Sequence, residues 1–249
     1  MSQVVLITGA NRGIGKGLVA HYLARPNTTV IGTVRDVSAQ QSQALQSTLQ
    51  KGPDSRLILV ALSASSASSA AAAASTIQTQ HGITSIDVVI ANAGICNHWG
   101  PVREMADTDA LAHFDVNTLG PLRLFQAMEP LLLNAAAPKF VLISSLLASI
   151  QEIEKMPTTL TAAYGMSKAA GNYMVRKIDA ESEQLVAVAI DPGLVQTDMG
   201  NRAAGLIGIE TAPLTVEDTV LGITKQIDAA TKSTTSGQFV NFNGDRIPW

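Results

Sequence analysis

The sequence predicts an α/β fold, in which helices cover both faces of a doubly wound, parallel sheet of seven strands. Two observations carry this prediction. Short apolar runs rich in β-branched residues alternate with helical patterns along the whole chain. No stretch interrupts this alternation as a linker would, and 249 residues with 46% apolar content are enough to bury one large core. We therefore expect a single domain that spans residues 1–249.

The strands are predicted from seven apolar runs. They lie at residues 4–7, 29–34, 57–62, 86–90, 140–143, 185–190 and 238–240. After the third run, residues 63–74 consist mostly of serine and alanine, a composition that also occurs in disordered linkers. Alanine is the best helix former and serine suits an N-cap, so we interpret this stretch as a loop followed by a helix.

Composition limits the classes of partner. The formal net charge is -3 and the Lys and Arg residues are scattered, so no nucleic-acid surface is expected. Every apolar run is far shorter than the ~20 residues of a membrane span. The single cysteine, Cys96, has no partner for an internal disulfide, and the chain begins with a strand pattern rather than a signal peptide. These features predict a cytoplasmic protein without membrane or nucleic-acid partners.

A glycine-rich turn joins the first strand to the first helix. Its glycines allow the backbone to turn tightly and to approach a pyrophosphate, and the helix that follows offers unpaired N–H groups at its positive end. Glycines also occur in ordinary turns, but this strand–turn–helix context favours a dinucleotide site. We expect that site to include Gly9, Asn11, Arg12, Gly13, Ile14 and Gly15.

The second predicted strand ends in Arg35 and Asp36, about 20 residues after the glycines, where such a fold distinguishes a ribose 2'-hydroxyl from a 2'-phosphate. Arg12 and Arg35 could both bind a phosphate, which favours NADPH. The alternative is that Arg35 points to solvent and Asp36 binds the ribose, which would indicate NAD.

Small residues follow the fourth strand, at the edge of the sheet where ligands bind in open α/β folds. Asn92, Ala93 and Gly94 leave room for a cofactor there. The loop at 95–101 then brings His98 and Trp99 to the ligand-facing edge. Because no second histidine lies at ligand spacing, no metal site is expected.

Two further positions draw attention along the chain. Asn117 lies inside a helix predicted at 108–133, although asparagine is a poor helix former, and this misfit hints at a functional role. The fifth strand ends in Ser144 and Ser145, and one of these serines should face the ligand.

A phenol and an ammonium stand four residues apart in the helix predicted at 164–180. This spacing puts Tyr164 and Lys168 on one helical face. A nearby ammonium stabilises a phenolate, so we expect Lys168 to lower the pKa of Tyr164 and to make it a general acid or base. Such pairs also occur on ordinary solvated helices, so the pair alone does not decide the function.

Two segments lack a clear helical or strand pattern. Residues 146–163, which include Pro157, are predicted to form a surface loop over the site. Residues 194–213 are glycine-rich and irregular, and this profile predicts a mobile substrate lid.

Taken in order, these motifs resemble the short-chain dehydrogenase/reductase superfamily and its Rossmann-type fold over the whole chain. Residues 8–15 look like its TGxxxGxG turn, 92–94 like its NAG segment and 191–193 like its PG motif. The sequences at 163–177 and 195–200 are most similar to fungal norsolorinic acid ketoreductases and sniffer-type carbonyl reductases. The resemblance implies a catalytic tetrad of Asn117, Ser145, Tyr164 and Lys168, and cofactor contacts from Tyr164, Lys168, Pro192, Gly193, Val195 and Thr197.

Two features depart from the family pattern. Ser63 stands where an aspartate commonly contacts the adenine, and we place it among the cofactor-binding residues. Ser145 and Tyr164 are separated by a longer insertion than usual, which resembles the carbonyl-reductase branch.

The resemblance implies NADPH-dependent reduction of a ketone or aldehyde. Ser145 would bind the carbonyl oxygen, Tyr164 would deliver the proton, and hydride would come from the nicotinamide. Lys168 would hold the nicotinamide ribose and Asn117 would anchor a water that relays protons. The alternative enzyme is an NAD-dependent alcohol dehydrogenase working in the oxidative direction. A cofactor-sensing regulator is disfavoured, because such proteins typically lack the tyrosine–lysine pair.

Assembly is predicted from the two long helices at 108–133 and 164–180. Both carry more apolar residues than one buried face requires, so we expect a homodimer or tetramer. A monomer is the alternative, since a comparable insertion before Tyr164 accompanies the monomeric state in some related carbonyl reductases.

Overall fold

A seven-stranded parallel sheet forms the centre of the computed structural model, which describes residues 2–156 and 159–249, so that Pro157 lies outside them. The strand order is β3-β2-β1-β4-β5-β6-β7, and every neighbouring pair is parallel. The strands are β1 (Gln3–Thr8), β2 (Thr28–Val34), β3 (Arg56–Ala61), β4 (Val88–Ala91), β5 (Lys139–Ile143), β6 (Val186–Asp191) and β7 (Phe239–Asn241). The predicted fold class is confirmed.

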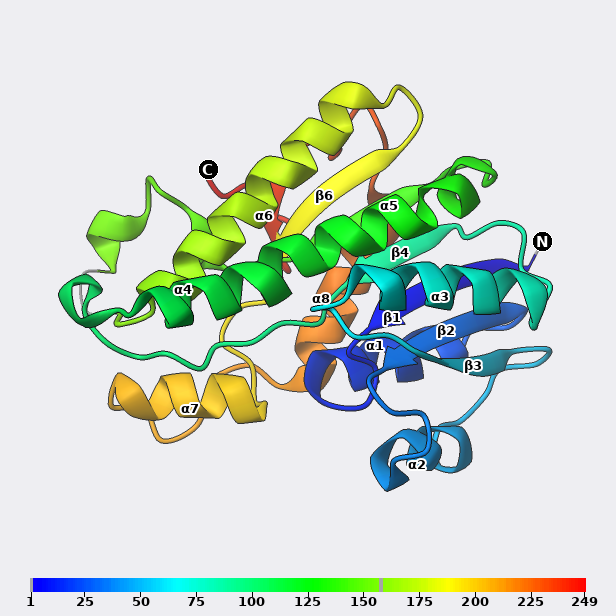
Figure 1. Ribbon diagram of the computed structural model, residues 1–249, viewed down its shortest axis with the longest axis horizontal. Helices are drawn as coiled ribbons and strands as arrows, with labels where there is room; N and C mark the ends of the chain where they lie inside the picture. The colour runs from blue at the N-terminus through cyan, green and yellow to red at the C-terminus, as the bar shows by residue number, and fades with distance from the viewer. Residues whose placement is uncertain (1, 157–158) are drawn as a thin grey trace.

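Helices cover both faces of this sheet (Figure 1). The α-helices in the described part of the chain are α1 (Gly13–Leu23), α2 (Gln40–Thr48), α3 (Ala67–Thr79), α4 (Asp107–Phe114), α5 (Gly120–Leu133), α6 (Ala162–Glu181), α7 (Asp198–Leu206) and α8 (Val216–Ala229). One core cluster packs α3, α5 and α6 against one face, and a second packs α1, α2 and α8 against the other. Burial on both faces explains why the strands are continuous apolar runs rather than alternating patterns.

The strand order places the site. The chain runs outward from β1 to β3 and then returns to β4 on the other side of β1. At such a switch point the connections leave the carboxyl ends of two neighbouring strands in opposite directions and open a crevice between them. Here the crevice lies between the ends of β1 and β4.

Several connections differ from the prediction. The helix expected at 108–133 is divided by a π-helical turn (Asp115–Leu119) between α4 and α5. Residues 194–213 are not irregular throughout, because α7 forms inside them and Thr197 caps its first turn, accepting a hydrogen bond of 3.1 Å from the Gly200 amide. The serine-rich stretch does form a loop and then a helix, with Ser66 as the N-cap of α3.

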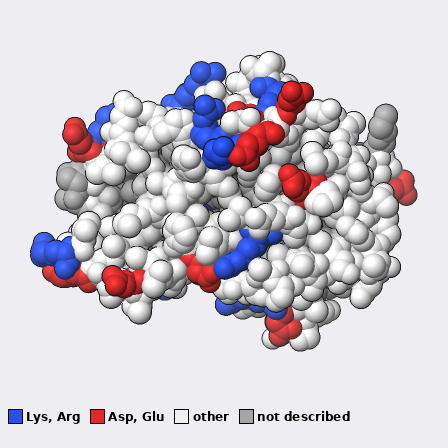
Figure 2. Space-filling view, turned by 45° about the horizontal axis from the view of Figure 1, so that its top comes forward, with Lys and Arg blue, Asp and Glu red and all other residues white. Residues whose placement is uncertain are grey.

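The surface has no large area of one charge on the face shown in Figure 2, where Lys and Arg alternate with Asp and Glu in small groups. Across residues 2–156 and 159–249, no helix is long and apolar enough to cross a membrane. Over the same ranges, no group of three or more His, Cys, Asp or Glu side chains is placed to hold a metal ion.

Candidate active site

The ends of β1 and β4 are joined by hydrogen bonds. The Thr8 hydroxyl accepts from the amides of Asn92 and Ala93, each at 3.0 Å. The Asn92 side chain in turn donates to the Thr8 carbonyl at 2.8 Å. These bonds hold the glycine turn beside the segment at 92–94, as expected for two parts of one cofactor site.

The glycine turn is shaped for a close approach of a ligand to the backbone. Gly9 and Gly13 have positive φ values of 66° and 50°, which side chains other than glycine rarely adopt. A Cβ at Gly15 would collide with the Gly9 carbonyl. No side chain caps α1, whose N-cap is Arg12, so its first-turn N–H groups remain available for an anion. The turn, with Asn11 and Ile14 half-buried in it, therefore fits a dinucleotide pyrophosphate.

The end of β2 leaves Arg35 exposed. The neighbouring Asp36 carboxylate accepts hydrogen bonds from the Ser38 hydroxyl at 2.6 Å and the Ser38 amide at 2.8 Å, and these bonds lower its pKa. Asp36 is thus already engaged in a turn, whereas Arg35 extends from the sheet edge. This arrangement suits a phosphate better than a ribose hydroxyl.

Two other predicted cofactor residues make contacts within the chain. The Arg12 guanidinium lies 3.5 Å from the Asp198 carboxylate of α7, and both side chains are exposed. The Ser63 amide donates to the Ser69 hydroxyl at 2.9 Å, and the Ser63 hydroxyl lies 3.2 Å from that of Ser65.

Tyr164 and Lys168 lie on one face of α6, as predicted. The Lys168 ammonium lies 5.7 Å from the centre of the Tyr164 ring. It donates a hydrogen bond of 2.7 Å to the Ile143 carbonyl at the end of β5, and the lysine is only 3% exposed. Gly94 leaves space beside it, since a Cβ there would lie 3.5 Å from the ammonium.

Asn117 sits in the π-helical turn and is completely buried. Its amide accepts from the Ile95 N–H at 2.8 Å and donates to the Ile95 carbonyl at 2.9 Å. It also donates to the Ser167 hydroxyl at 3.0 Å, which donates to the Tyr164 carbonyl at 2.7 Å. Asn117 therefore connects the β4 loop to the helix that carries Tyr164. The sequence offered no signal for this role of Ser167.

The two serines at the end of β5 have different surroundings. Ser144 is buried, and its hydroxyl donates to Asn172 at 2.6 Å. Ser145 is half-buried, its hydroxyl accepts from the Leu147 amide at 3.3 Å, and that hydroxyl acts to lower the pKa of the Tyr164 phenol. Gly165 packs so closely on the turn after Ser145 that a Cβ would lie 2.8 Å from the Leu147 carbonyl. Of the two, Ser145 is therefore the candidate for contact with a ligand.

The pKa values at this site are set mainly by burial. Burial raises the pKa of the Tyr164 phenol, and the Ser145 hydroxyl only partly opposes this. Burial also lowers the pKa of the Lys168 ammonium to about 8. The expected lowering of the Tyr164 pKa by Lys168 is therefore wrong for the chain alone, because desolvation of the buried phenol is the largest effect on this pKa.

The base of α7 lies against the glycine turn. A Cβ at Gly13 would lie 3.1 Å from the Thr197 methyl group. Gly193, which precedes α7 in the chain, has a φ of 74° and turns the backbone. On either side of it, the Pro192 carbonyl accepts from the Thr219 hydroxyl at 3.4 Å, and Val195 forms a β-bridge with Leu214. Residues 192–197 thus pass directly beside the expected cofactor site.

Comparisons with known proteins agree with this geometry. Residues 3–205 match the sequence profile of the short chain dehydrogenase family. The norsolorinic acid ketoreductase nor1 of Dothistroma septosporum is 45% identical over 247 residues, which cover 98% of this chain and 91% of the relative. The NADPH-bound carbonyl reductase from chicken fatty liver has a TM-score of 0.88 at 32% identity, with 100% of this chain and 99% of the other covered. The carbonyl reductase Sniffer of D. melanogaster has a TM-score of 0.85 at 25% identity over 100% of both chains.

A doubly wound parallel sheet with a glycine turn at its switch point defines a Rossmann-type protein. The match of residues 3–205 and the 45% identical relative show that this chain belongs to the short-chain dehydrogenase/reductase family. It is therefore an oxidoreductase of that family. The resemblance inferred from the motifs is confirmed.

Proposed function

We propose that this enzyme reduces a ketone or aldehyde to the alcohol with NADPH, and that Tyr164 is the proton donor. The observation that carries the proposal is the placement of Tyr164 beside Lys168 at the carboxyl edge of the sheet, where the Lys168 ammonium lies 5.7 Å from the centre of the phenol ring and donates to the Ile143 carbonyl at the end of β5. Burial raises the pKa of this phenol, so it is fully protonated at neutral pH, which is the state that a proton donor needs.

Each side chain of the proposed site has a separate role in the reduction of the substrate carbonyl. Ser145 donates a hydrogen bond to that oxygen and polarises the carbonyl, and Tyr164 transfers its proton to the same oxygen. Lys168, with a pKa of about 8, exchanges protons with its surroundings near neutral pH. Asn117 holds the Ile95 loop and, through Ser167, the first turns of α6, so it keeps these groups in register.

NADPH, when bound, supplies the hydride. Its pyrophosphate would be held by Gly9, Gly13 and Gly15 with the uncapped start of α1, and its 2'-phosphate would be held by Arg35. The adenosine side would be lined by Asn11, Arg12, Ile14, Ser63 and residues 92–94. The nicotinamide side would be lined by Tyr164, Lys168, Pro192, Gly193, Val195 and Thr197. The engagement of Asp36 by Ser38 supports NADPH over NADH. A solved relative named as an NADPH-bound carbonyl reductase supports it as well.

The oxidative, NAD-dependent alternative is not favoured. It would need Tyr164 to act as a phenolate base, while burial raises the pKa of this phenol. It would also need Asp36 to leave its turn and bind the ribose.

The substrate lid and the assembly are further parts of the proposal. We assign residues 194–213, with α7 at their centre, as the substrate lid. We also infer that residues 1–249 form a single domain and that the enzyme is cytoplasmic.

The exposed side chains of Leu111 and Phe114 on α4, and of Met166 and Tyr173 on α6, support a homodimer or tetramer formed through these helices. A light-scattering mass near the 26.0 kDa of one chain would contradict it.

The experiment that tests the function is an assay of the purified protein with a panel of ketones and aldehydes, with NADPH or NADH as reductant. We expect NADPH oxidation that depends on the carbonyl compound and slower oxidation of NADH. Turnover only of alcohols with NAD would reverse the assignment.

A further inference from the structure

The backbone is held on both sides of Ser145, where β5 ends. The amide of Ser144, just before it, donates to the Ile190 carbonyl of β6 at 2.7 Å and so continues the ladder of the two parallel strands. The amide of Leu146, just after it, donates instead to a side chain, the Asp191 carboxylate, at 2.8 Å. Ser145 is thus the one residue between these two attachments.

The Asp191 side chain stands in for a backbone acceptor. In a parallel pair of strands, the next partner of the Leu146 amide would be the Pro192 carbonyl. That carbonyl accepts from the Thr219 hydroxyl at 3.4 Å, and the chain turns at Gly193 with a φ of 74°. The carboxylate therefore extends the contact between β5 and β6 by one bond beyond the point where their backbones pair.

Asp191 is buried without a cation beside it. It is 7% exposed, and none of the ion pairs in the described part of the chain includes it. Burial raises the pKa of this carboxyl, and the amides of Leu146 and Gly193 oppose the shift. Its charge in turn raises the pKa of the Tyr164 phenol. A buried carboxyl without a cation costs stability, and groups of this kind gather at functional sites.

The turn that Asp191 holds also sets the place of the Ser145 side chain. Ser145 is the N-cap of a 3-10 turn (Leu146–Ala148), its hydroxyl accepts from the Leu147 amide, and its carbonyl accepts from the Ala148 amide at 2.8 Å. The direction of the hydroxyl therefore depends on where this turn begins. The bond from the Leu146 amide to Asp191 fixes that point.

We propose that Asp191 is a positioning residue for the reaction, whose carboxyl oxygen holds the Leu146 amide and thereby orients the Ser145 hydroxyl toward the substrate carbonyl. Asp191 acts through Ser145 and takes no part in proton transfer. The inference rests on the proposed reduction, in which Ser145 polarises that carbonyl.

A matched control lies at the opposite edge of the sheet. The half-buried carboxylate of Asp87, just before β4, accepts from the Val4 amide of β1 at 2.7 Å. This is the amino edge of the sheet, whereas the site lies at the carboxyl ends of the strands. Asp87 thus makes the same kind of contact to a backbone amide, with no proposed catalytic side chain beside it.

The kinetic test is a double-mutant cycle between Asp191 and Ser145, with the ketone that the wild type reduces fastest. Asp191→Leu removes the acceptor, and we expect kcat to fall about tenfold, the scale of one lost hydrogen bond, while KM for NADPH stays within about twofold. In a Ser145→Ala background, Asp191→Leu should lower kcat by less than about twofold, because the hydroxyl through which it acts is absent.

Two further variants define the cause of this loss. Asp191→Asn keeps an acceptor oxygen and should recover most of kcat, and Asp87→Leu should leave kcat unchanged. A tenfold loss in both backgrounds would show that Asp191 acts independently of Ser145 and would overturn the proposal. A loss in Asp191→Asn as large as in Asp191→Leu would overturn it too, because the acceptor would then not matter. Asp191→Ser, whose hydroxyl is too short to reach the Leu146 amide, replaces Asp191→Leu in the cycle if the leucine variant does not fold.

The second test does not depend on turnover. Amide hydrogen exchange is followed by NMR on the isotope-labelled protein, and the Leu146 amide should exchange about tenfold faster in Asp191→Leu than in wild type or Asp191→Asn. The Val4 amide should respond only to Asp87→Leu. Unchanged exchange at Leu146 in Asp191→Leu would overturn the positioning role. Faster exchange there, together with a wild type that reduces no ketone or aldehyde, would instead refute the proposed reduction and leave the hold of Asp191 on the Ser145 turn standing.

Discussion

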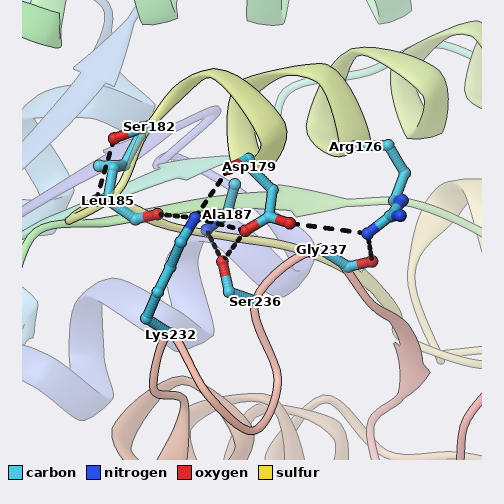
Figure 3. A network of polar contacts seen from close by, with 8 residues as sticks. All are labelled: Arg176, Asp179, Ser182, Leu185, Ala187, Lys232, Ser236 and Gly237. Atoms are coloured by element: carbon cyan, nitrogen blue, oxygen red, sulfur yellow. Dashed lines mark hydrogen bonds and ion pairs between the residues drawn. The ribbon is translucent and has the colours of Figure 1, made fainter.

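The two ends of α6 carry polar clusters that behave in opposite ways. At the C-terminal end, the Asp179 carboxylate accepts from Lys232 at 2.6 Å and from the Ser236 hydroxyl at 2.5 Å, with Arg176 at 3.6 Å (Figure 3). Lys232 also donates to the carbonyls of Asp179 and Leu185. Burial alone would raise the pKa of Asp179, but these partners outweigh it and hold the pKa below its usual range.

At the N-terminal end, burial is not compensated in this way. It raises the pKa of Tyr164 and lowers that of Lys168, so burial disfavours the charged form of each group. The helix α6 thus carries two polar clusters of different kinds. The cluster around Asp179 stabilises the fold, whereas in the cluster of Tyr164 and Lys168 the phenol is kept neutral and the lysine has a pKa close to neutral pH. Groups of the second kind gather where chemistry occurs, which makes the contrast a test of the site assignment.

The largest effect is expected from Tyr164→Phe. The ring is kept and only the hydroxyl is removed, so we expect turnover to fall by ~100-fold to 10,000-fold, the range for loss of a general acid. NADPH affinity, measured by fluorescence titration, should change little.

Tyr173→Phe is the matched control for this variant. Tyr173 lies on the same helix, is 71% exposed and has no part in the site. Full activity of Tyr173→Phe together with full activity of Tyr164→Phe would show that the N-terminal cluster is structural, like the other.

The next effect compares the exposed Arg35 with its neighbour Asp36, whose carboxylate is already hydrogen-bonded to Ser38. Arg35→Ala should raise the KM for NADPH roughly tenfold to a hundredfold and leave that for NADH almost unchanged, because a charge-assisted phosphate contact is lost. Asp36→Asn should have a smaller effect on either cofactor, since its carboxylate is bound to Ser38. Equal changes in both KM values would remove Arg35 from the 2'-phosphate site.

Some features of the fold and of the proposed site could be predicted from the sequence, and others could not. The glycine turn, the seven strands and the Tyr164–Lys168 spacing depend on local order, and each was predictable from neighbouring residues. The pairing of Ser144 with Asn172 was not, because it joins a strand end to a helix face 28 positions away. This long-range contact engages the Ser144 hydroxyl and supports Ser145 as the serine of the proposed site.

The direction of the Tyr164 pKa was mispredicted for a related reason. The sequence shows that an ammonium is near the phenol, but not how deeply the pair is buried or that Lys168 donates to the Ile143 carbonyl. Similarly, α7 was missed because its nine residues are mostly small or polar and its first turn depends on the Thr197 cap. Burial and capping of this kind require the packed structure.

Asp179→Asn tests the stabilising cluster. We expect a loss of ~1 to 2 kcal/mol of unfolding free energy, seen as a Tm lower by about 2 to 8 °C, with kcat unchanged. A carboxylate with a lowered pKa stabilises the fold above its unfolded pKa, and this contribution is lost as pH falls through the folded pKa. The Tm difference between wild type and Asp179→Asn should therefore shrink in acid.

Glu181→Gln is the control for this prediction. Glu181 pairs with Lys177 at 2.6 Å on the same helix, but both side chains are more than half exposed, so no measurable change in Tm is expected. A Tm loss in Glu181→Gln as large as that in Asp179→Asn would mean that burial does not distinguish the two pairs.

The smallest effect, and the one with the opposite sign, is expected for Lys168. Its pKa is about 8 in the folded chain and about 10.4 when unfolded, so between these values the unfolded state binds more protons and stability rises with pH. From about pH 7 to about pH 9, wild type should gain ~1 kcal/mol relative to Lys168→Met, in which this titration is absent. At neutral pH the variant should unfold at the same temperature as wild type or higher, although its activity is lost. Thermal unfolding of both proteins across this pH range measures the difference. A clear loss of stability in Lys168→Met at neutral pH would show that the lysine, like Lys232, holds the fold together, and the contrast between the two ends of α6 would fail.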